Sequence, residues 1–376
     1  MTKILFLIHD LSVGGAEKVL VNLVNNMDRT KFDITVIALF GGGVNEQFLK
    51  PHIHYRAIFR KTFRGNSKLL KLFSPSYLHR RFIKEQYDIE VSYLEGPSAR
   101  IISGCPEPDT KLISWIHVEQ HTRARACGSF RSYAEAERCY GKFDQTVCVS
   151  DYVRSDFLSI FPALRNVIVL YNTNETAQIL EQQNEPVEEG LFNADEIKLC
   201  GVGKIVKTKG FDRITRIIKR LTDDGFPVHA YYLGQGDQRP EIESYAAENG
   251  IADRITFLGY QTNPYKYVSK CDLFVCASFS EGFSTAATEA LIVGTPVCTV
   301  EVSGMKEMLG EHNEYGVVCE NTEDALYAAI RELISDPDKL AHYKKQAEIR
   351  GKDFSTEETV RAVEEMLEKL PQRKRS

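Results

Sequence analysis

Short apolar runs alternate with longer amphipathic stretches along almost the whole chain. In the first half, runs rich in β-branched and aromatic residues predict strands at 3–9, 33–39, 88–94, 111–117, 145–149 and 167–171. Helical spacing of apolar residues predicts a helix from Ala16 to Met27, directly after the first of these runs. Strands that alternate with helices are typical of an α/β fold with parallel sheets.

The alternation breaks at 176–196, a stretch rich in Glu, Gln and Asn that predicts a linker. Beyond it the pattern predicts strands at 197–203, 228–234, 255–258, 272–276 and 296–300, and helices at 210–224, 239–249, 263–270, 284–293, 322–335, 338–348 and 355–370. We therefore expect one domain at 1–175 and a second at 197–354. A C-terminal helix with a basic tail, 355–376, can pack back on the first domain.

The composition is that of an ordinary soluble protein with more than one domain, because 43% of the 376 residues are hydrophobic and 26% are charged. No apolar run reaches the roughly 18 residues that span a bilayer. The first apolar run meets Asp10 too early for a signal peptide. The nine cysteines include no C-x-x-C pair and no zinc-ligand cluster. We expect a protein of the reducing cytosol.

Two glycine-containing turns follow predicted strands and precede predicted helices. Adjacent Gly14 and Gly15 let the backbone approach another group closely, and the helix N-terminus favours an anion. This turn does not fit G-x-G-x-x-G, so a plain tight turn is an equal alternative. At 201–210, three lysines follow a glycine-ended strand, so ammonium groups and free amides could surround a diphosphate. A solvated lysine-rich loop is the alternative there.

A third turn, at 280–291, places a glutamate on each side of a helix start. Ser284 or Thr285 can cap this helix, and the amides of its first turn can hold phosphate oxygens. Carboxylates beside an anionic phosphate are costly unless they accept hydrogen bonds from hydroxyl donors. Glu281 and Glu289 therefore favour a sugar over a metal as their partner.

With these motifs, nearly the whole chain resembles the retaining nucleotide-sugar glycosyltransferases of family 4, which have the GT-B fold of two facing Rossmann-like domains with a cleft between them. The most specific match is the pair Glu281 and Glu289 with seven residues between them. Other matches follow in order and spacing: Gly201–Gly210, Leu233-Gly234-Gln235-Gly236, Phe257-Leu258-Gly259-Tyr260, Ala290-Leu291 and Gly294-Thr295-Pro296-Val297.

The resemblance implies a role for each matching residue. Lys204 and Lys209 neutralise the donor diphosphate, although the family more often has Arg at the first position. Glu289 holds the ribose diol and Glu281 the hydroxyls of the donor sugar. His117 lines the reaction centre, with His121 as an alternative occupant. The full set of expected donor-binding residues is Gly14, Gly15, Gly203, Lys204, Lys209, Gly234, Tyr260, Glu281, Gly282, Phe283, Ser284, Thr285 and Glu289, and the expected catalytic residues are His117, Lys204, Lys209 and Glu281.

The expected reaction is transfer of a hexose or N-acetylhexosamine from a nucleotide-diphosphate sugar, with uridine as the expected nucleoside, to a glycan or lipid-linked acceptor bound by the first domain. Lysines and helix amides stabilise the charge that develops on the leaving diphosphate. We expect neither a metal nor a cofactor, because the only D-x-D, Asp336-Pro337-Asp338, is typical of a helix N-cap. A nucleotide-sugar epimerase on the same fold and a non-catalytic nucleotide-sugar-binding module remain alternatives.

Charge is unevenly distributed within the formal net of −5. Residues 1–180 carry 23 Lys and Arg against 18 Asp and Glu, and residues 181–376 carry 24 against 34. Residues 47–84 hold ten basic residues and no acidic one, interleaved with phenylalanines and leucines. This composition predicts peripheral docking on an anionic, cytoplasmic membrane surface and not on nucleic acid. The expected docking residues are Arg60, Lys61, Arg64, Lys68, Lys71, Arg80, Arg81 and Lys84.

The alternative for this segment is that its apolar residues face the core and its basic residues are only solvated.

Overall fold

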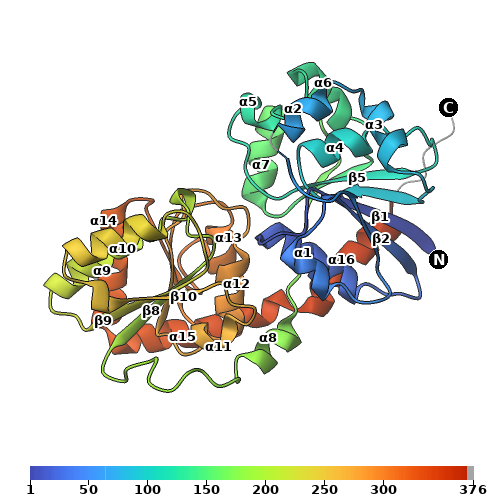
Figure 1. Ribbon diagram of the computed structural model, residues 1–376. Helices are drawn as coiled ribbons and strands as arrows, with labels where there is room; N and C mark the ends of the chain where they lie inside the picture. The colour runs from blue at the N-terminus through green and yellow to red at the C-terminus, as the bar shows by residue number, and fades with distance from the viewer. Residues whose placement is uncertain (64, 371–376) are drawn as a thin grey trace. The chain divides into compact units, whose positions relative to one another are not determined.

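The computed structural model describes residues 1–63 and 65–370. The chain divides into two compact units. The first consists of Met1–Thr173 and the chain from Thr356 onward, and the second of Asn174–Ser355. Each unit is built on a parallel sheet (Figure 1).

The described part of the first unit holds a seven-stranded sheet in the order β3-β2-β1-β4-β5-β6-β7. Its strands are β1 (Thr2–Ile8), β2 (Phe32–Phe40), β3 (His54–Phe59), β4 (Ile89–Ser92), β5 (Lys111–Ile116), β6 (Gln145–Cys148) and β7 (Val167–Val169). Every neighbouring pair is parallel. The order reverses beside β1, so this is a doubly wound sheet as predicted.

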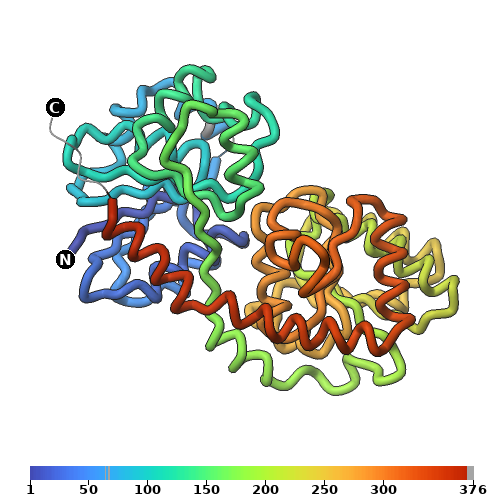
Figure 2. Tube along the Cα trace, turned by 180° about the vertical axis from the view of Figure 1, so that it is seen from behind, coloured from blue at the N-terminus to red at the C-terminus, as the bar shows by residue number. Residues whose placement is uncertain are grey.

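Helices cover both faces of this sheet, with α1 and α16 on one face and α3, α4 and α6 on the other (Figure 1). The helices of the first unit are α1 (Gly15–Asn26), α2 (Asn66–Lys71), α3 (Pro75–Phe82), α4 (Pro97–Ile102), α5 (Arg123–Ala126), α6 (Tyr133–Tyr140), α7 (Asp151–Ile160) and α16 (Thr356–Glu368). Figure 2 shows that α16, near the C-terminus of the chain, lies against the N-terminal part of the first unit. There the Asp28 amide donates to Glu364 Oε1 at 2.6 Å.

In the second unit, the described residues form a six-stranded sheet in the order β10-β9-β8-β11-β12-β13. Its strands are β8 (Ile197–Val202), β9 (Val228–Leu233), β10 (Ile255–Gly259), β11 (Leu273–Cys276), β12 (Val297–Val300) and β13 (Val317–Cys319). Its helices are α8 (Thr176–Gln182), α9 (Phe211–Asp223), α10 (Arg239–Glu248), α11 (Tyr265–Val268), α12 (Thr285–Ile292), α13 (Met305–Leu309), α14 (Glu323–Ser335) and α15 (Pro337–Gly351). The predicted linker segment 176–196 begins with α8 and lies within this unit.

The central strands are apolar on both faces because helices cover both sides of each sheet. Residues Ile4–Ile8 of β1 are completely buried, and so are Val228 and Tyr232 of β9. The core of the second unit joins β9 to α9 and α14. In the described part of the chain, no helix has both the length and the apolar character needed to cross a membrane.

Candidate functional site

The lysine loop joins β8 to α9 at the carboxyl edge of the second sheet. Gly210 caps α9 with a φ of 68°, a left-handed conformation that side chains disfavour. A Cβ at Gly210 would lie 2.2 Å from the carbonyl oxygen of Ala277, so a larger residue would push this loop away from the loop after β11. The Phe279 amide donates to the Thr208 carbonyl at 2.8 Å and joins the same two loops.

Three glycine turns pack backbone against backbone beside this loop. The Gly234 amide donates to the Gly259 carbonyl at 2.7 Å, one residue before Tyr260. A Cβ at Gly234 would lie 1.8 Å from the carbonyl oxygen of Gly203, and Gly234 has a φ of 145°. The structure therefore brings the predicted residues Gly203, Gly234 and Tyr260 to one edge of the sheet, where parallel strands present their ligand-binding loops.

An ion pair joins the lysine loop to the glutamate turn. Lys209 Nζ lies 2.6 Å from Glu281 Oε1, and the Ser278 hydroxyl donates to the same oxygen at 2.6 Å. Burial disfavours the ammonium, but the Glu281 carboxylate outweighs it and raises the pKa of Lys209. Lys209 is therefore charged, and its side chain is half-buried. Lys204 lies exposed in the same loop.

The helix after this turn, α12, begins as the sequence predicts. The Ser284 side chain accepts from the Ala287 amide and caps the helix, and Gly282 and Phe283 lead into it. The next residue, Thr285, is the first of α12. Within α12, Glu289 is only 7% exposed, and the Tyr265 hydroxyl donates to its carboxylate at 3.4 Å. Glu289 is therefore buried in the helix that follows β11, at the carboxyl edge of the sheet, where open α/β sheets bind ligands.

In the first unit, Gly14 and Gly15 lie where β1 passes into α1. Gly14 is extended, and a Cβ there would meet only the flexible end of Glu17. The turn before them is braced: the Ser12 amide donates to Asp10 at 2.8 Å, and the Asn45 side chain donates to the Ser12 carbonyl at 2.6 Å.

His117 follows β5 at the carboxyl edge of the first sheet and is 6% exposed. Its ring hydrogen-bonds to the backbone of Tyr93, and its Nε2 is buried without a hydrogen-bond partner. Burial lowers the pKa of His117 to about 3. The ring is therefore neutral, with one unused nitrogen that is suited to a hydroxyl group.

This burial predicts a specific pH dependence of stability. The unfolded histidine titrates near pH 6.5 and the folded one near 3, so stability falls as the pH falls between these values. From about pH 8 to about pH 5 the wild type should lose about 2 kcal/mol more free energy of unfolding than His117→Gln. Urea unfolding at the two pH values measures this difference. Equal losses in both proteins would show that His117 is not held neutral.

Two carboxylates that sequence analysis missed hold the backbone after His117. Glu95 Oε2 accepts from the His117 amide at 3.1 Å, and burial raises the pKa of Glu95. Asp156 accepts from the Gln120 amide at 2.6 Å and from the His121 amide at 3.1 Å. His121 has a φ of 58°, so this loop is strained as well as braced. The sequence did contain one indication of this role, because Glu95 lies just after a predicted apolar strand.

Among the described residues, two groups have the composition of a metal site, and both lie in the first unit: His79 with Glu90 and Cys105, and Glu119 with His121 and Asp156. Their carboxylates already have partners. Glu90 lies 2.7 Å from His79 Nε2, and Asp156 accepts backbone amides. The Asp336-Pro337-Asp338 sequence is the N-cap of α15, with Asp336 accepting from the amides of Asp338 and Lys339, as predicted.

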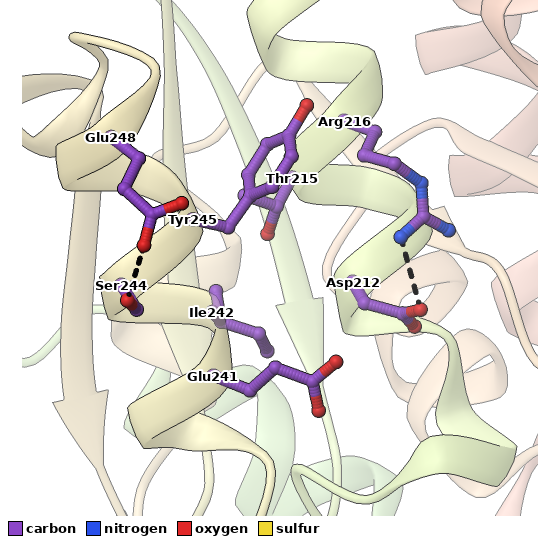
Figure 3. Close-up of a pocket in the computed structure, with 8 residues that line it drawn as sticks. All are labelled: Asp212, Thr215, Arg216, Glu241, Ile242, Ser244, Tyr245 and Glu248. Carbon is purple, nitrogen blue, oxygen red and sulfur yellow. Dashed lines mark hydrogen bonds and ion pairs between the residues drawn. The ribbon is translucent and has the colours of Figure 1, made fainter.

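A hollow of about 370 Å³ lies between α9 and α10 in the second unit (Figure 3). None of the residues expected to bind the donor lines it. The lining residues are Asp212, Thr215, Arg216, Glu241, Ile242, Ser244, Tyr245 and Glu248. Lys207, the remaining lysine of the loop, pairs with Asp212 at 2.9 Å at one end of this hollow.

Two family models match successive parts of the chain. The model described as Glycosyltransferase Family 4 matches residues 13–177, and the model described as Glycosyl transferases group 1 matches residues 182–350. The chain belongs to the group 1 glycosyltransferases. The resemblance inferred from the motifs is thereby confirmed, and the protein is a transferase of glycosyl groups.

Two curated relatives match this glycosyltransferase over most of its length. One, 25% identical over 94% of this chain and 96% of its own, is the Campylobacter jejuni N-acetylgalactosamine-N,N'-diacetylbacillosaminyl-diphospho-undecaprenol 4-alpha-N-acetylgalactosaminyltransferase. Another, 23% identical over 88% of each chain, is the Rhizobium meliloti lipopolysaccharide core biosynthesis glycosyltransferase LpsD.

Solved structures share the fold of the glycosyltransferase. Anabaena HepE in complex with UDP-glucose has a TM-score of 0.78, 19% identity, and coverage of 98% of this chain and 100% of that one. Staphylococcus aureus TarM has a TM-score of 0.76 with 14% identity over 98% of each chain. The predicted GT-B fold of two Rossmann-like domains is confirmed.

Proposed function

We propose that the protein is a retaining, metal-independent glycosyltransferase that moves a hexose or N-acetylhexosamine from a UDP-sugar to a lipid-linked glycan acceptor. The observation that carries this proposal is the ion pair of Lys209 with Glu281 beside the buried Glu289. It sets one cation and two carboxylates at a single sheet edge, which matches the phosphates and hydroxyls of a nucleotide sugar. The names of HepE bound to UDP-glucose and of the Campylobacter jejuni enzyme support the donor and acceptor classes.

In this proposal the second unit binds the donor and the first unit binds the acceptor. Lys209, with Lys204 and the amides of Phe283 to Thr285, faces the diphosphate and stabilises the negative charge that grows as the sugar–phosphate bond breaks. Glu281 accepts hydrogen bonds from the sugar hydroxyls, and Glu289 from the ribose. The sugar centre becomes oxocarbenium-like, and the leaving phosphate takes the acceptor proton. No protein carboxylate then has to act as base.

His117 contributes through its unused Nε2, which accepts a hydrogen bond from a sugar hydroxyl in this scheme. Gly14 and Gly15 have no side chain, so the backbone there can lie close to the transferred sugar. We assign the enzyme to the cytoplasm, at the inner face of the membrane. This location supplies nucleotide sugars and lipid-linked acceptors together.

Thermal-shift measurements with a panel of nucleotide sugars test donor binding, the first step of the proposed reaction. A UDP-linked hexose or N-acetylhexosamine should raise Tm, because ligand that binds only the folded state stabilises it by RT ln(1 + [L]/Kd). Glu289→Ala should lose most of this shift, and Glu243→Ala, which removes an exposed carboxylate of α10, should keep it. A folded wild type that no nucleotide sugar stabilises would contradict the proposal.

The nucleotide-sugar epimerase and the non-catalytic binding module are separated by the product. The proposal predicts a new glycosidic bond with the anomeric configuration of the donor, seen by mass spectrometry and NMR. An epimerised free sugar, or donor binding without any transfer, would favour the alternatives.

Removal of metal ions should leave the transfer rate unchanged. Lysines and helix amides supply the positive charge that a metal supplies elsewhere. Transfer measured with and without EDTA tests this. A complete loss in EDTA that manganese restores would overturn the metal-independent mechanism.

A further inference from the structure

Four exposed apolar side chains gather where α2 ends and α3 begins. We call this set, Leu69, Leu72, Phe73 and Tyr77, the apolar tip. Leu72 is 71% exposed, and the other three are exposed as well. Leu69 lies in α2, Leu72 and Phe73 follow the end of this helix, and the Phe73 ring stacks on Tyr77 with the ring centroids 5.1 Å apart. Two other leucines of the segment, Leu70 and Leu78, are buried beneath.

The apolar tip corrects part of the picture drawn from the sequence. Some apolar residues of the segment 47–84 face the core, as the alternative for this segment expects, and others are exposed. Docking on a membrane stays a prediction. Of the expected docking residues, Arg60, Lys61, Lys68, Arg80, Arg81 and Lys84 are exposed, Lys71 is half-buried, and Arg64 lies outside the described residues. The exposed bases flank an apolar surface that has its own fixed shape.

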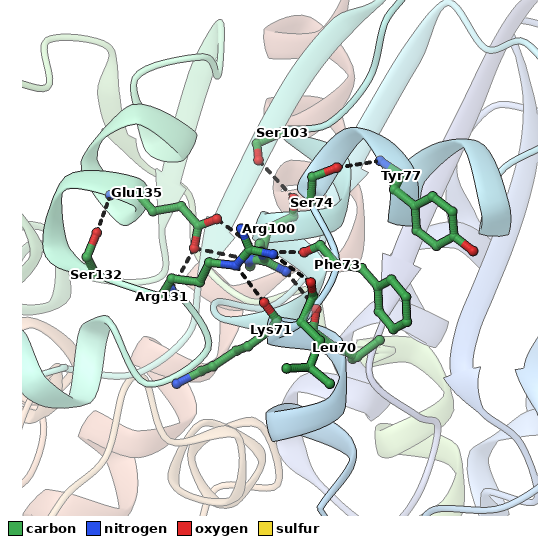
Figure 4. Close-up of polar contacts among 11 residues, drawn as sticks. Leu70, Lys71, Phe73, Ser74, Tyr77, Arg100, Ser103, Arg131, Ser132 and Glu135 are labelled. Atoms are coloured by element: carbon green, nitrogen blue, oxygen red, sulfur yellow. Dashed lines mark hydrogen bonds and ion pairs between the residues drawn. The ribbon is translucent and has the colours of Figure 1, made fainter.

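Two arginines fix this shape by donating to backbone carbonyls at and just after the end of α2. Arg100 donates to the carbonyls of Leu70 at 2.9 Å and Phe73 at 2.7 Å. Arg131 donates to the carbonyls of Lys71 at 2.6 Å and Leu72 at 2.7 Å (Figure 4). The carbonyls of residues 70–73, at and just beyond the end of α2, therefore all have donors within the protein.

Arg100 is itself held in place by a buried carboxylate. It is 1% exposed, and its guanidinium bonds Glu135 at 3.0 and 3.2 Å (Figure 4). A turn that only faces water needs no such support, since water satisfies helix-end carbonyls. A turn that enters an apolar medium does need it, because an unsatisfied backbone group is costly there.

The charges around the apolar tip match an anionic surface. Lys68 lies on α2 beside it, and Arg80 and Arg81 lie about one turn after Tyr77 on α3. The segment 47–84 contains no acidic residue. Apolar side chains ringed by bases are typical of proteins that lie in the headgroup layer of a membrane.

We propose that the apolar tip inserts into the interfacial layer of an anionic bilayer, with Leu72 and Phe73 entering the acyl boundary and the flanking bases binding headgroups. This rests on the proposed use of a lipid-linked acceptor and adds the anchoring residues. Insertion of apolar side chains, and not charge alone, then binds the enzyme to the membrane. Binding therefore survives salt in part, whereas attraction by surface charge is screened within a Debye length.

Co-sedimentation with vesicles tests the proposal on the full chain. The probes are phosphatidylglycerol–phosphatidylcholine vesicles and vesicles of phosphatidylcholine alone, at low and high salt. Leu72→Asp should lower the partition coefficient on anionic vesicles about tenfold or more at both salt concentrations. The double variant Arg80→Gln with Arg81→Gln should lose mainly the salt-sensitive part. Ile349→Asp, at a 51% exposed position of α15, should bind like the wild type.

Several outcomes would overturn the insertion. They are unchanged vesicle binding of a folded Leu72→Asp protein, no wild-type binding to either vesicle, or a dimer in lipid-free solution that Leu72→Asp dissociates. Equal wild-type binding to neutral and anionic vesicles would overturn the proposed binding of headgroups by the flanking bases. Transfer to an acceptor solubilised in detergent keeps this test separate from the proposed activity. Leu72→Asp should retain transfer in detergent, and loss of transfer in detergent by the wild type would contradict the proposed function alone.

Discussion

Replacing Lys209 by alanine should lower kcat by about 30- to 1000-fold, which corresponds to about 2–4 kcal/mol of transition-state stabilisation. The half-buried ammonium keeps its charge because Glu281 raises the pKa of Lys209, and in the proposed mechanism it faces the diphosphate as negative charge develops there. Steady-state transfer at saturating donor measures the effect. Lys219→Ala, which breaks an ion pair with Asp223 on α9, serves as the matched control and should keep wild-type turnover.

The structure adds a second consequence to this variant. Lys209→Ala leaves the Glu281 carboxylate with Ser278 but without its cation. Part of the loss could then come from a displaced glutamate, and a double-mutant cycle with Glu281→Gln separates the two effects. A strong positive coupling would assign the loss to the ion pair. Near-wild-type turnover of Lys209→Ala would show that Lys209 does not bind the phosphates.

Replacing Arg100 by alanine should lower the free energy of unfolding by about 3–5 kcal/mol, because it leaves the buried Glu135 carboxylate without the cation that pairs with it. The carbonyls of Leu70 and Phe73 lose their donor in the same step. Urea unfolding of the purified protein measures the change. Arg131→Ala removes two carbonyl bonds from a more exposed side chain and should be milder, by about 1–3 kcal/mol in total.

A loss below about 1 kcal/mol for Arg100→Ala would mean that Glu135 finds another partner or takes up a proton. In that case the buried ion pair would not be what holds the end of α2 rigid.

Hydrophobic pattern predicts the central strands well because helices bury both faces of them. β1, β2 and β8 each coincide with a predicted run to within a residue or two. The edge strand β3 was missed because its sequence, His-Tyr-Arg-Ala-Ile-Phe, is only half-buried and shows no apolar run. The short helices α2 and α3 were missed for a related reason: their exposed faces carry leucines and bases together.

The site was predictable in part. The glutamate spacing and the glycines of the lysine loop are local in sequence, so they could be read directly. The Lys209–Glu281 ion pair joins residues 72 positions apart and arises because β8 and β11 are neighbours in the sheet. Glu95 and Asp156 act on backbone amides of a distant loop, and no sequence spacing encodes that contact.

The return of α16 to the first unit sets the order in which the two units can be finished during synthesis. Residues 174–355 form an unbroken stretch, so the ribosome releases the whole second unit while the first still lacks its last helix. Until α16 has been synthesised, the surface of α1 that it covers stays exposed. The Asp28 amide also lacks its acceptor, Glu364, until that point. The N-terminal unit is the first to leave the ribosome and the last to be completed.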